Sequence, residues 1–231
     1  MDDAAVLDDP VGESLRGRHA HLARRHGRAL SYRSAVATFS AVPLQPGADD
    51  WADLAALLGP DGFADMFSSP AAPPPDWAPA FAVDGVQMVG DPDRLAAAGP
   101  DPDVVELGEA DVADMLDLVA RTRPGPFRPE THRLGTYLGI REAGELVAMA
   151  GERLRPPGWT EISAVCTAPA ARGRGLGARL VRAAAARIIG RGERPFLHVV
   201  VENAGAFELY RRLGFSVRRD VTFRGYRTPP A

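Results

Sequence analysis

The chain has 231 residues, 45% of them hydrophobic, a formal net charge of −3 and no run of 18 apolar residues, so it can bury one sizeable core or two small ones without a membrane-spanning helix. Its one cysteine, Cys166, excludes an intrachain disulfide, and the five histidines show no metal-ligand spacing with it, so we expect no metal. All 27 basic residues are arginine, which excludes a GxxxxGK[ST] phosphate loop, a Schiff-base lysine and a lysine general base.

The chain begins with MDDAAVLDDP, which lacks both the basic and the apolar region of a secretory signal, so we expect a cytoplasmic protein. The patterns that follow predict a helix near residues 13–25, strands at 29–32 and 37–42, and a helix at 50–58. None of these segments carries a recognisable chemical motif.

A predicted turn and a predicted boundary come next. Asp84-Gly85 lies between alternating apolar residues in FAVDGVQMV and predicts a two-residue hairpin. Residues 89–103, VGDPDRLAAAGPDPD, crowd Gly, Pro and Asp around one short alanine run. We therefore place a domain boundary near residue 100, with residues 1–100 as a smaller N-terminal α/β domain of unclear role and residues 101–231 as a second domain.

The second half shows a regular succession of elements. The predicted strands are 104–107, 135–141, 145–154, 160–167, 196–201 and a closing strand pair within 215–226. The predicted helices are 110–120, 175–189 and 205–213. Because residues 142–144 make a hairpin turn, we expect an α/β (α+β) fold whose mixed, mostly antiparallel sheet is flanked by helices.

A glycine-rich stretch, TAPAARGRGLGARL at residues 167–180, joins a predicted strand to a predicted helix. Its three glycines are Gly173, Gly175 and Gly177. They remove the side chains that would hold a phosphate away from the backbone N–H groups at the start of the helix. Arg172 and Arg174 can add charge-assisted hydrogen bonds. The stretch therefore predicts a pyrophosphate site, against the alternative of a glycine-rich surface turn.

The six residues GRGLGA also fit the dinucleotide fingerprint GxGxxG/A, and Glu202 follows the next strand where a ribose-binding acid is wanted. The context argues against a nicotinamide dinucleotide, because residues 168–172 separate the strand from the first glycine. A predicted antiparallel hairpin, and not a parallel unit, also precedes that strand.

The motif Arg172-x-x-Gly175-x-Gly177 resembles the acyl-CoA-binding loop R/Q-x-x-G-x-G/A of the GNAT superfamily of N-acetyltransferases. Downstream, NAGAFELYRRLGF at residues 203–215 resembles the Asn, Tyr and LGF signature of that family, and upstream AVCTAPAARGRG is similar to its glycine N-acyltransferase-like subgroup. The resemblance covers residues 104–227 and implies a GNAT-like fold with acetyl-CoA as co-substrate. Residues 1–100 could be a degenerate second copy of that fold.

The resemblance implies an acyl-CoA-dependent N-acyltransferase in which an amine attacks the thioester directly. It implies that the thioester carbonyl lies beside a splayed strand whose backbone N–H groups bind the oxyanion. The residues implied to bind acetyl-CoA are Val165, Cys166, Thr167, Arg172, Gly173, Arg174, Gly175, Leu176, Gly177 and Asn203. Cys166 could instead be a nucleophile, but a buried core thiol is favoured because no activating group neighbours it.

The same resemblance makes Tyr210 the general acid that protonates the leaving thiolate, against the alternative of a ring that only packs on the sheet. For the general base we rank Glu161 first, because it alternates with Ser163, Val165 and Thr167 along the acyl-binding strand. Glu152 ranks second. His198 and Glu202 could reach the same cleft.

Charge divides unevenly, since residues 1–103 hold 16 acidic residues against 7 arginines and the rest hold 14 against 20. A basic second half favours an anionic ligand, while scattered arginines without a stacking motif argue against nucleic acid. We therefore expect acyl-CoA and an amine acceptor as partners, with no nucleic acid and no membrane. We expect residues 104–231 to hold the acyl-CoA site and residues 1–100 to cover its acceptor side. The alternative is a non-catalytic acyl-CoA-binding sensor or interaction module.

Overall fold

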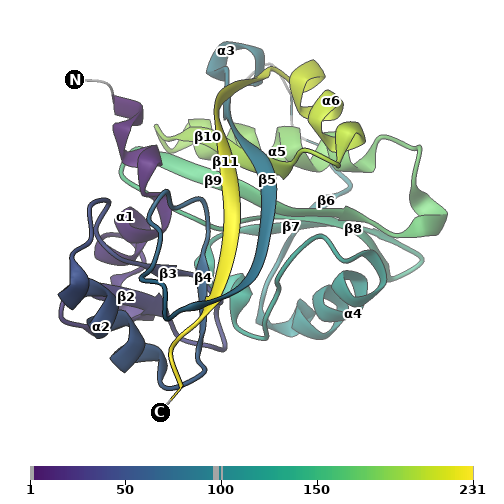
Figure 1. Ribbon diagram of the computed structural model, residues 1–231. Helices are drawn as coiled ribbons and strands as arrows, with labels where there is room; N and C mark the ends of the chain where they lie inside the picture. The colour runs from purple at the N-terminus through teal and green to yellow at the C-terminus, as the bar shows by residue number, and fades with distance from the viewer. Residues whose placement is uncertain (1–2, 96–98, 100, 231) are drawn as a thin grey trace.

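The computed structural model describes residues 3–95, 99 and 101–230, and its main element is an eight-stranded sheet (Figure 1). The strand order is β4-β11-β5-β10-β9-β8-β7-β6. Their bounds are β4 Phe63–Met66, β5 Ala78–Gly90, β6 Val104–Leu107, β7 Tyr137–Glu142, β8 Glu145–Glu152, β9 Trp159–Thr167, β10 Arg194–Val200 and β11 Phe215–Arg227. Only β9 and β10 pair in parallel among these neighbours. The predicted mixed, mostly antiparallel sheet is confirmed.

Helices cover both faces of this sheet. Helix α5 (Leu176–Gly190) lies on one face, next to α6 (Ala204–Leu213), and α4 (Val112–Thr122) lies on the opposite face (Figure 1). Helix α4 buries Met115 and Leu118, and α5 buries an apolar stripe from Leu180 to Ile188 against the strands. The 3.6-residue spacing of these apolar residues made the three helices predictable, and each lies within about three residues of its expected bounds.

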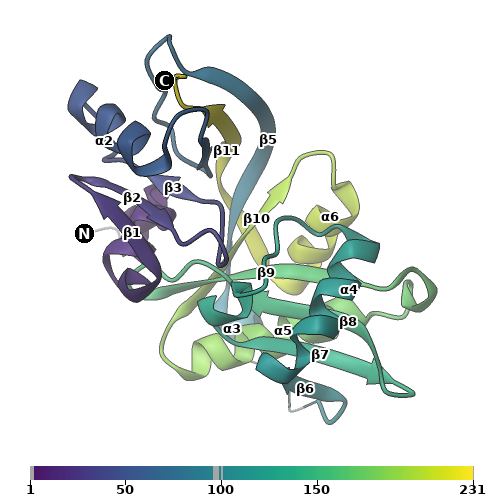
Figure 2. The same ribbon diagram turned by 90° about the horizontal axis from the view of Figure 1, so that it is seen from below.

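The N-terminal residues build a second, smaller layer beside the main sheet (Figure 2). It holds α1 (Pro10–Arg16), α2 (Ala48–Leu58) and a three-stranded antiparallel sheet of β1 (Ala23–His26), β2 (Ala29–Tyr32) and β3 (Ser40–Ala41). The helix predicted over residues 13–25 is wrong, because α1 ends at Arg16 and the chain turns through Gly27 at φ +50° to pair β1 with β2. In residues 23–26, strand pairing with β2 thus overrides the local helix propensity.

The hairpin predicted at Asp84-Gly85 is also wrong, since β5 runs without interruption through both residues. Gly85 serves close packing: a Cβ there would lie 2.4 Å from the Phe223 ring and 2.8 Å from the Val199 carbonyl oxygen. Strand β5 separates β10 from β11 and pairs antiparallel with both. The predicted closing pair within residues 215–226 is therefore a single strand, because its partners β4 and β5 come from the first half of the chain.

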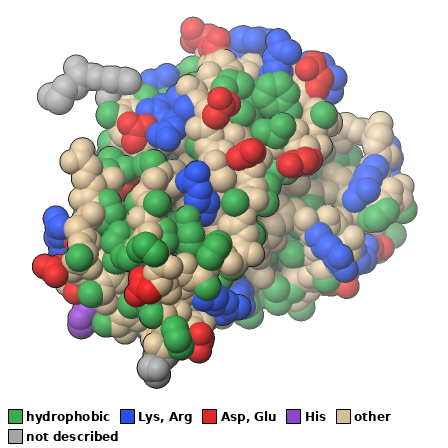
Figure 3. Space-filling model, in the orientation of Figure 1, with side chains coloured by type: hydrophobic (Ala, Val, Ile, Leu, Met, Phe, Trp, Pro, Cys, Tyr) green, Lys and Arg blue, Asp and Glu red, His purple; other side chains and the backbone are tan. Residues whose placement is uncertain are grey.

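The predicted boundary near residue 100 adjoins residues 96–98 and 100, which lie outside the described residues. On either side of it, β4 and β5 share one sheet with β6 to β11. The division into two functional parts, and the idea that the first is a degenerate copy of the second, stay predictions. The face in Figure 3 intersperses arginines with acidic side chains and shows no large patch of one sign. No helix in the described part of the chain is both long and apolar enough to span a bilayer.

Candidate active site

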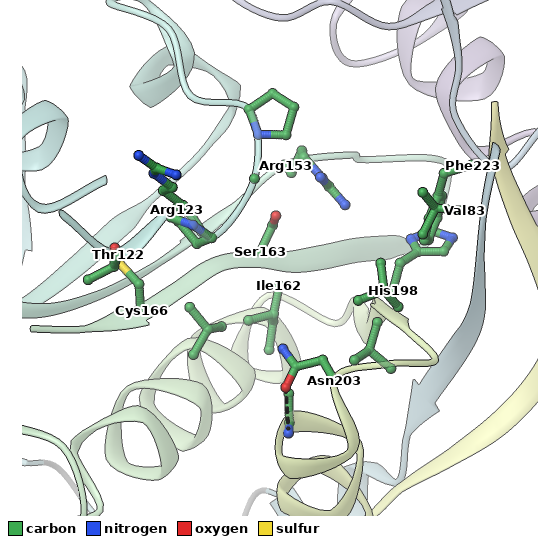
Figure 4. A pocket seen from close by; sticks show the side chains of 18 of the residues that line it. Val83, Thr122, Arg123, Arg153, Ile162, Ser163, Cys166, His198, Asn203 and Phe223 are labelled. Atoms are coloured by element: carbon green, nitrogen blue, oxygen red, sulfur yellow. Dashed lines mark hydrogen bonds between the residues drawn. The ribbon is translucent and has the colours of Figure 1, made fainter. Parts of the chain in front are cut away.

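The candidate site is the cleft that opens where β9 and β10 part. These strands pair only from Trp159 to Glu161 with Arg194 to Phe196, and beyond that point the sheet is split. Residues 162–167 and 198–200 line a cleft of about 730 Å³. In Figure 4, Thr122 and Cys166 mark one end of it, and His198 and Phe223 mark the other. Toward β10, the backbone of residues 162–167 therefore has no strand partner.

A β-bulge in β9 decides which side chains face which way. Ser163 pairs with Gly151 and Cys166 with Met149, so β9 carries one extra residue, and Ala164 has a φ of +52°. Ser163 lines a small pocket together with Arg153 and residues 124–127, which follow α4. Val165 and Thr167 face Gly177 at the start of α5, on the other side. The expectation that Glu161, Ser163, Val165 and Thr167 share one face is therefore wrong, because the bulge reverses the alternation.

The glycine loop joins β9 to α5 through a short 3-10 turn, Pro169–Ala171. Gly173 and Gly175 both have a φ of +77°, a conformation that side-chain-bearing residues rarely adopt, and a Cβ on either would meet nothing within 4 Å. Backbone conformation, and not crowding, thus calls for these glycines. The N-cap of the 15-residue helix α5 is Gly175, which has no side chain to bind the first N–H groups. The N–H groups of its first turn are left to bind an anion, with the helix dipole in support.

The two predicted loop arginines have different surroundings. Arg172 lines the cleft, and its Nε donates to the Thr167 carbonyl oxygen at 3.3 Å. Arg174 turns away and forms a two-point ion pair with Glu142, at 2.9 and 2.5 Å. Arg123, the left-handed residue that follows α4, also lines the cleft, although no motif marks it in the sequence. Arg172 and Arg123 thus both bring positive charge to the cleft lining.

Helix α6 presents two predicted residues to the cleft, Asn203 and Tyr210. Asn203 is the N-cap, its Oδ1 accepting from the Ala206 N–H at 3.1 Å (dashed in Figure 4). Tyr210 is 8% exposed, and its ring meets Phe215 edge-on at 6.0 Å between centroids. Burial raises the pKa of Tyr210 to about 12, so its hydroxyl is protonated at neutral pH and can donate.

The predicted base Glu161 is fully buried and does not line the cleft. Its carboxylate accepts from Arg153 at 2.8 and 2.6 Å, and Oε1 lies 2.6 Å from His198 Nδ1. Burial alone would raise the pKa of Glu161, but the charge and hydrogen bonds of Arg153, with those of His198, outweigh it and lower the pKa to about 2. Both partners of Glu161 line the cleft.

The second predicted base, Glu152, is 2% exposed and lies outside the cleft lining. It pairs with Arg191 at 2.9 Å and accepts from the Thr136 N–H at 3.2 Å. Glu202 is exposed on the turn after β10. The roles of Glu161 and Glu152 as general bases stay predictions, although each carboxylate already has structural partners.

Cys166 lines the cleft but is 7% exposed, and burial raises the pKa of its thiol. A raised pKa lowers the thiolate population, which favours a packed thiol over a nucleophile. Among the described residues, no three His, Cys, Asp or Glu side chains gather closely enough to hold a metal ion.

Sequence reasoning missed the residues that close the far end of the cleft. They are Phe39, Asp65, Phe67, Phe81 and Val83 from the first half of the chain, with Arg153 and Phe223 from the second; His198, which the sequence analysis expected to reach the cleft, lies with them. They carry no motif, because they meet only when β4 pairs with β11, Asp65 opposite Gly225. The nearest signal was the expectation that residues 1–100 cover the acceptor side.

Comparison with known proteins supports this geometry. A family model described as FR47-like protein matches residues 137–224. The chain is 40% identical to a crystal structure from Novosphingobium aromaticivorans assigned to the GNAT family of acetyltransferases, with a TM-score of 0.88 over 98% of this chain and 99% of that one. It is 39% identical over 98 residues to the N-alpha-acetyltransferase RimI of Mycobacterium tuberculosis, a match that spans 41% of this chain and 60% of that relative.

A more distant structure, a GCN5-related N-acetyltransferase from Kribbella flavida, is 18% identical with a TM-score of 0.61 over 97% of this chain and 96% of that one. At that identity the likeness concerns the fold alone. It extends over both halves of the chain, so the N-terminal layer is part of the shared architecture.

Proposed function

The chain belongs to the GNAT family of N-acetyltransferases, and from that premise we propose that it moves an acetyl group from acetyl-CoA to an amine by direct attack of the amine on the thioester. The observation that carries the proposal is the parting of β9 and β10, which leaves the backbone of β9 without a strand partner in the cleft, one short turn before the glycine loop and the uncapped start of α5. Membership of the family supports acetyl transfer as the reaction. The acceptor and the residue roles given below are our proposals.

In this proposal the phosphates of acetyl-CoA bind the loop from Arg172 to Gly177. The N–H groups of the first turn of α5 and the Arg172 guanidinium supply hydrogen bonds and positive charge. The pantetheine arm follows the split between β9 and α6, where Asn203 lies. The thioester carbonyl lies beside Val165, Cys166 and Thr167, whose backbone lacks a partner on the β10 side. Arg174 was expected to bind the phosphates as well, but it is paired with Glu142, so it would have to leave that partner to reach them.

In the proposed chemistry, groups of this chain act on two atoms of the thioester, the carbonyl oxygen and the sulfur. Backbone N–H groups of β9 stabilise the negative charge that develops on the carbonyl oxygen as the amine attacks. The Tyr210 hydroxyl, held in place by ring packing on Phe215, protonates the sulfur as the carbon–sulfur bond breaks. Glu161 holds Arg153 and His198 in the cleft wall, and we keep Glu161 and Glu152 as candidate bases to be tested.

Two finer expectations remain hypotheses. The likeness of AVCTAPAARGRG to glycine N-acyltransferase-like proteins suggests a small acceptor, and a cytoplasmic location suits a protein that uses acetyl-CoA. The first can be tested with the same amine panel that tests the activity.

The test begins with acetyl-CoA binding by calorimetry. Gly175→Leu forces a side chain into a left-handed position beneath the proposed phosphates, so binding should weaken at least about tenfold, or 1.4 kcal/mol. Gly190→Ala, at the other end of α5 with open space around it, is the matched control. Thiol release with an amine panel then tests turnover. Tight binding without turnover on any amine would indicate a non-catalytic binding module, and binding of NAD instead of acetyl-CoA would overturn the loop assignment.

A further inference from the structure

The far end of the cleft is lined mainly by aromatic rings. Phe67 stacks on Phe223 at 4.7 Å between centroids with an interplanar angle of 13°, and it meets Phe39 at 4.7 Å and His198 at 4.9 Å. Phe81 and Val83 of β5 line the same end. Such a wall binds apolar groups by removing their surface from water, and the ring faces also attract a cation.

The positive charges at this end are already compensated. The Arg153 guanidinium lies over Phe67 and Phe39, at 4.4 and 5.3 Å from the centroids, while its Nε and Nη2 donate to Glu161. Burial lowers the pKa of His198, although Glu161 opposes this effect, and a lowered pKa favours the neutral imidazole at pH 7. The Arg153–Glu161 pair and His198 therefore add no net charge to the pocket.

Asp65 is the remaining charged group of this pocket. It is 4% exposed, lines the cleft from β4, and accepts from the Thr38 hydroxyl at 2.6 Å. Among the described residues no arginine or histidine forms an ion pair with it within 4.0 Å. Burial raises the pKa of Asp65 to about 6, although the Thr38 hydrogen bond and the charge of Arg153 oppose the rise. A buried carboxylate that forms no ion pair with the described residues can take a cation from outside the chain as its partner.

We propose that this end is the acceptor pocket, that it takes a primary amine carried on an apolar or aromatic group, and that Asp65 binds the ammonium and accepts its proton. The inference rests on the proposed acetyl transfer and names its acceptor class and general base. An acceptor that also bears a carboxylate is disfavoured, because Arg153 is matched by Glu161 and Asp65 would repel a second anion.

The proton balance is complete with groups of this chain. The ammonium gives one proton to the Asp65 carboxylate, and the free amine then forms the carbon–nitrogen bond as the carbon–sulfur bond breaks. Tyr210 gives its proton to the thiolate. After the carbon–nitrogen bond forms, the nitrogen loses a second proton, which returns the Tyr210 phenolate to its protonated form. The proton on Asp65 leaves to solvent. The products are therefore the amide, the CoA thiol and one released proton.

The test measures thiol release from acetyl-CoA with phenethylamine, over a range of pH. Asp65→Asn preserves shape and should lower kcat/KM by about 10² to 10⁴-fold while acetyl-CoA affinity stays within about twofold. Asp76→Asn, an exposed aspartate before Trp77, is the matched control and should leave kcat/KM unchanged. Phenylalanine, which adds a carboxylate to the same amine, should react at least about tenfold more slowly than phenethylamine.

The pH profile separates a base from a structural residue. If the enzyme binds the ammonium through ionised Asp65, kcat/KM should rise through about pH 6 and then stay level. The plateau would begin at a pH well below the pKa of the amine. Asp65→Asn must instead capture the free amine, so its kcat/KM keeps rising with pH. Thr38→Val removes a hydrogen bond that lowers the pKa of Asp65 and should move the inflection upward. The other groups facing this position are Arg153 and His198, with Glu161 behind them.

If Asp65→Asn and Thr38→Val both keep the rate and pH profile of the wild type, Asp65 is not the base, and if phenylalanine reacts as fast as phenethylamine, the acceptor class is wrong. Glu161→Gln or Glu152→Gln losing the inflection while Asp65→Asn keeps it would assign the base to one of those residues. An enzyme that releases no thiol with any amine would overturn the proposed function, and the acceptor pocket with it.

Discussion

Glu161→Gln should destabilise the folded protein by about 3 kcal/mol. The wild-type carboxylate is fully buried, receives two hydrogen bonds from Arg153 and touches His198 Nδ1. Glutamine fills the same volume and keeps one acceptor oxygen, but it leaves the largely buried Arg153 charge without a counterion. Breaking a buried ion pair by removing one partner typically costs about 3–5 kcal/mol, and the retained acceptor places this variant at the low end.

Urea unfolding followed by circular dichroism measures the free energy of unfolding directly, and in a thermal melt a loss of this size corresponds to roughly 6–12 °C. A double variant, Arg153→Met with Glu161→Leu, removes both charges and should lose less stability than the two single changes add up to. A free energy of unfolding for Glu161→Gln within about 0.5 kcal/mol of the wild type, or additive effects of the two single changes, would contradict a buried ion pair between Arg153 and Glu161.

The Arg153–Glu161 pair also makes the stability of the folded protein depend on pH. The folded-state pKa of Glu161, about 2, lies below its ordinary value of 4.5, so the folded protein gains stability from this carboxylate at every pH above about 4.5. That gain is lost as the pH falls from 4.5 through about 2. The stability difference between wild type and Glu161→Gln should therefore shrink over this acidic window and stay constant above it.

Three further predictions concern the site and the fold. Tyr210→Phe keeps the ring packed on Phe215 and should retain acetyl-CoA affinity while turnover falls by about 10² to 10⁴-fold; an unchanged turnover number, where chemistry limits the rate, would leave Tyr210 as a packing residue. Gly175→Leu should lose acetyl-CoA affinity in calorimetry while Gly190→Ala keeps it, and equal affinities would refute the loop assignment. A chain starting at residue 104 lacks β4 and β5 and should fail to fold by circular dichroism, whereas a soluble, cooperatively melting product would show that β5 is dispensable.

Local patterns predicted much of the second half of the chain. The hairpin of β7 and β8, the strand β9 and the helices α4, α5 and α6 follow from periodicity and turn residues that lie within one short window. The positive φ of Gly173 and Gly175 could likewise be expected from a loop that turns its N–H groups inward. These features depend on residues close in sequence, which is why sequence reasoning reaches them.

What escaped prediction depends on partners far along the chain. Gly85 reads as a turn residue until Phe223 is packed against it, and the bulge at Ala164 is invisible in an alternating strand. Because of this bulge, Val165 faces the start of α5, whereas Glu161 faces the opposite side of the sheet, against Arg153. Asp65 became a candidate only when β4 was seen beside β11, since no short motif surrounds it. Long-range pairing, and not local propensity, thus determines the acceptor side.

The place of β5 in the sheet also has a consequence for synthesis of the chain. Both of its neighbours, β10 and β11, are translated later, and residues 91–214 separate β5 from the strand that completes the sheet. Pairing over such a separation slows folding, because a long loop must close before any contact rewards it. During most of translation this 13-residue strand has neither edge paired, so it is the segment from which we expect aggregation of the nascent chain, or its capture by chaperones, to begin.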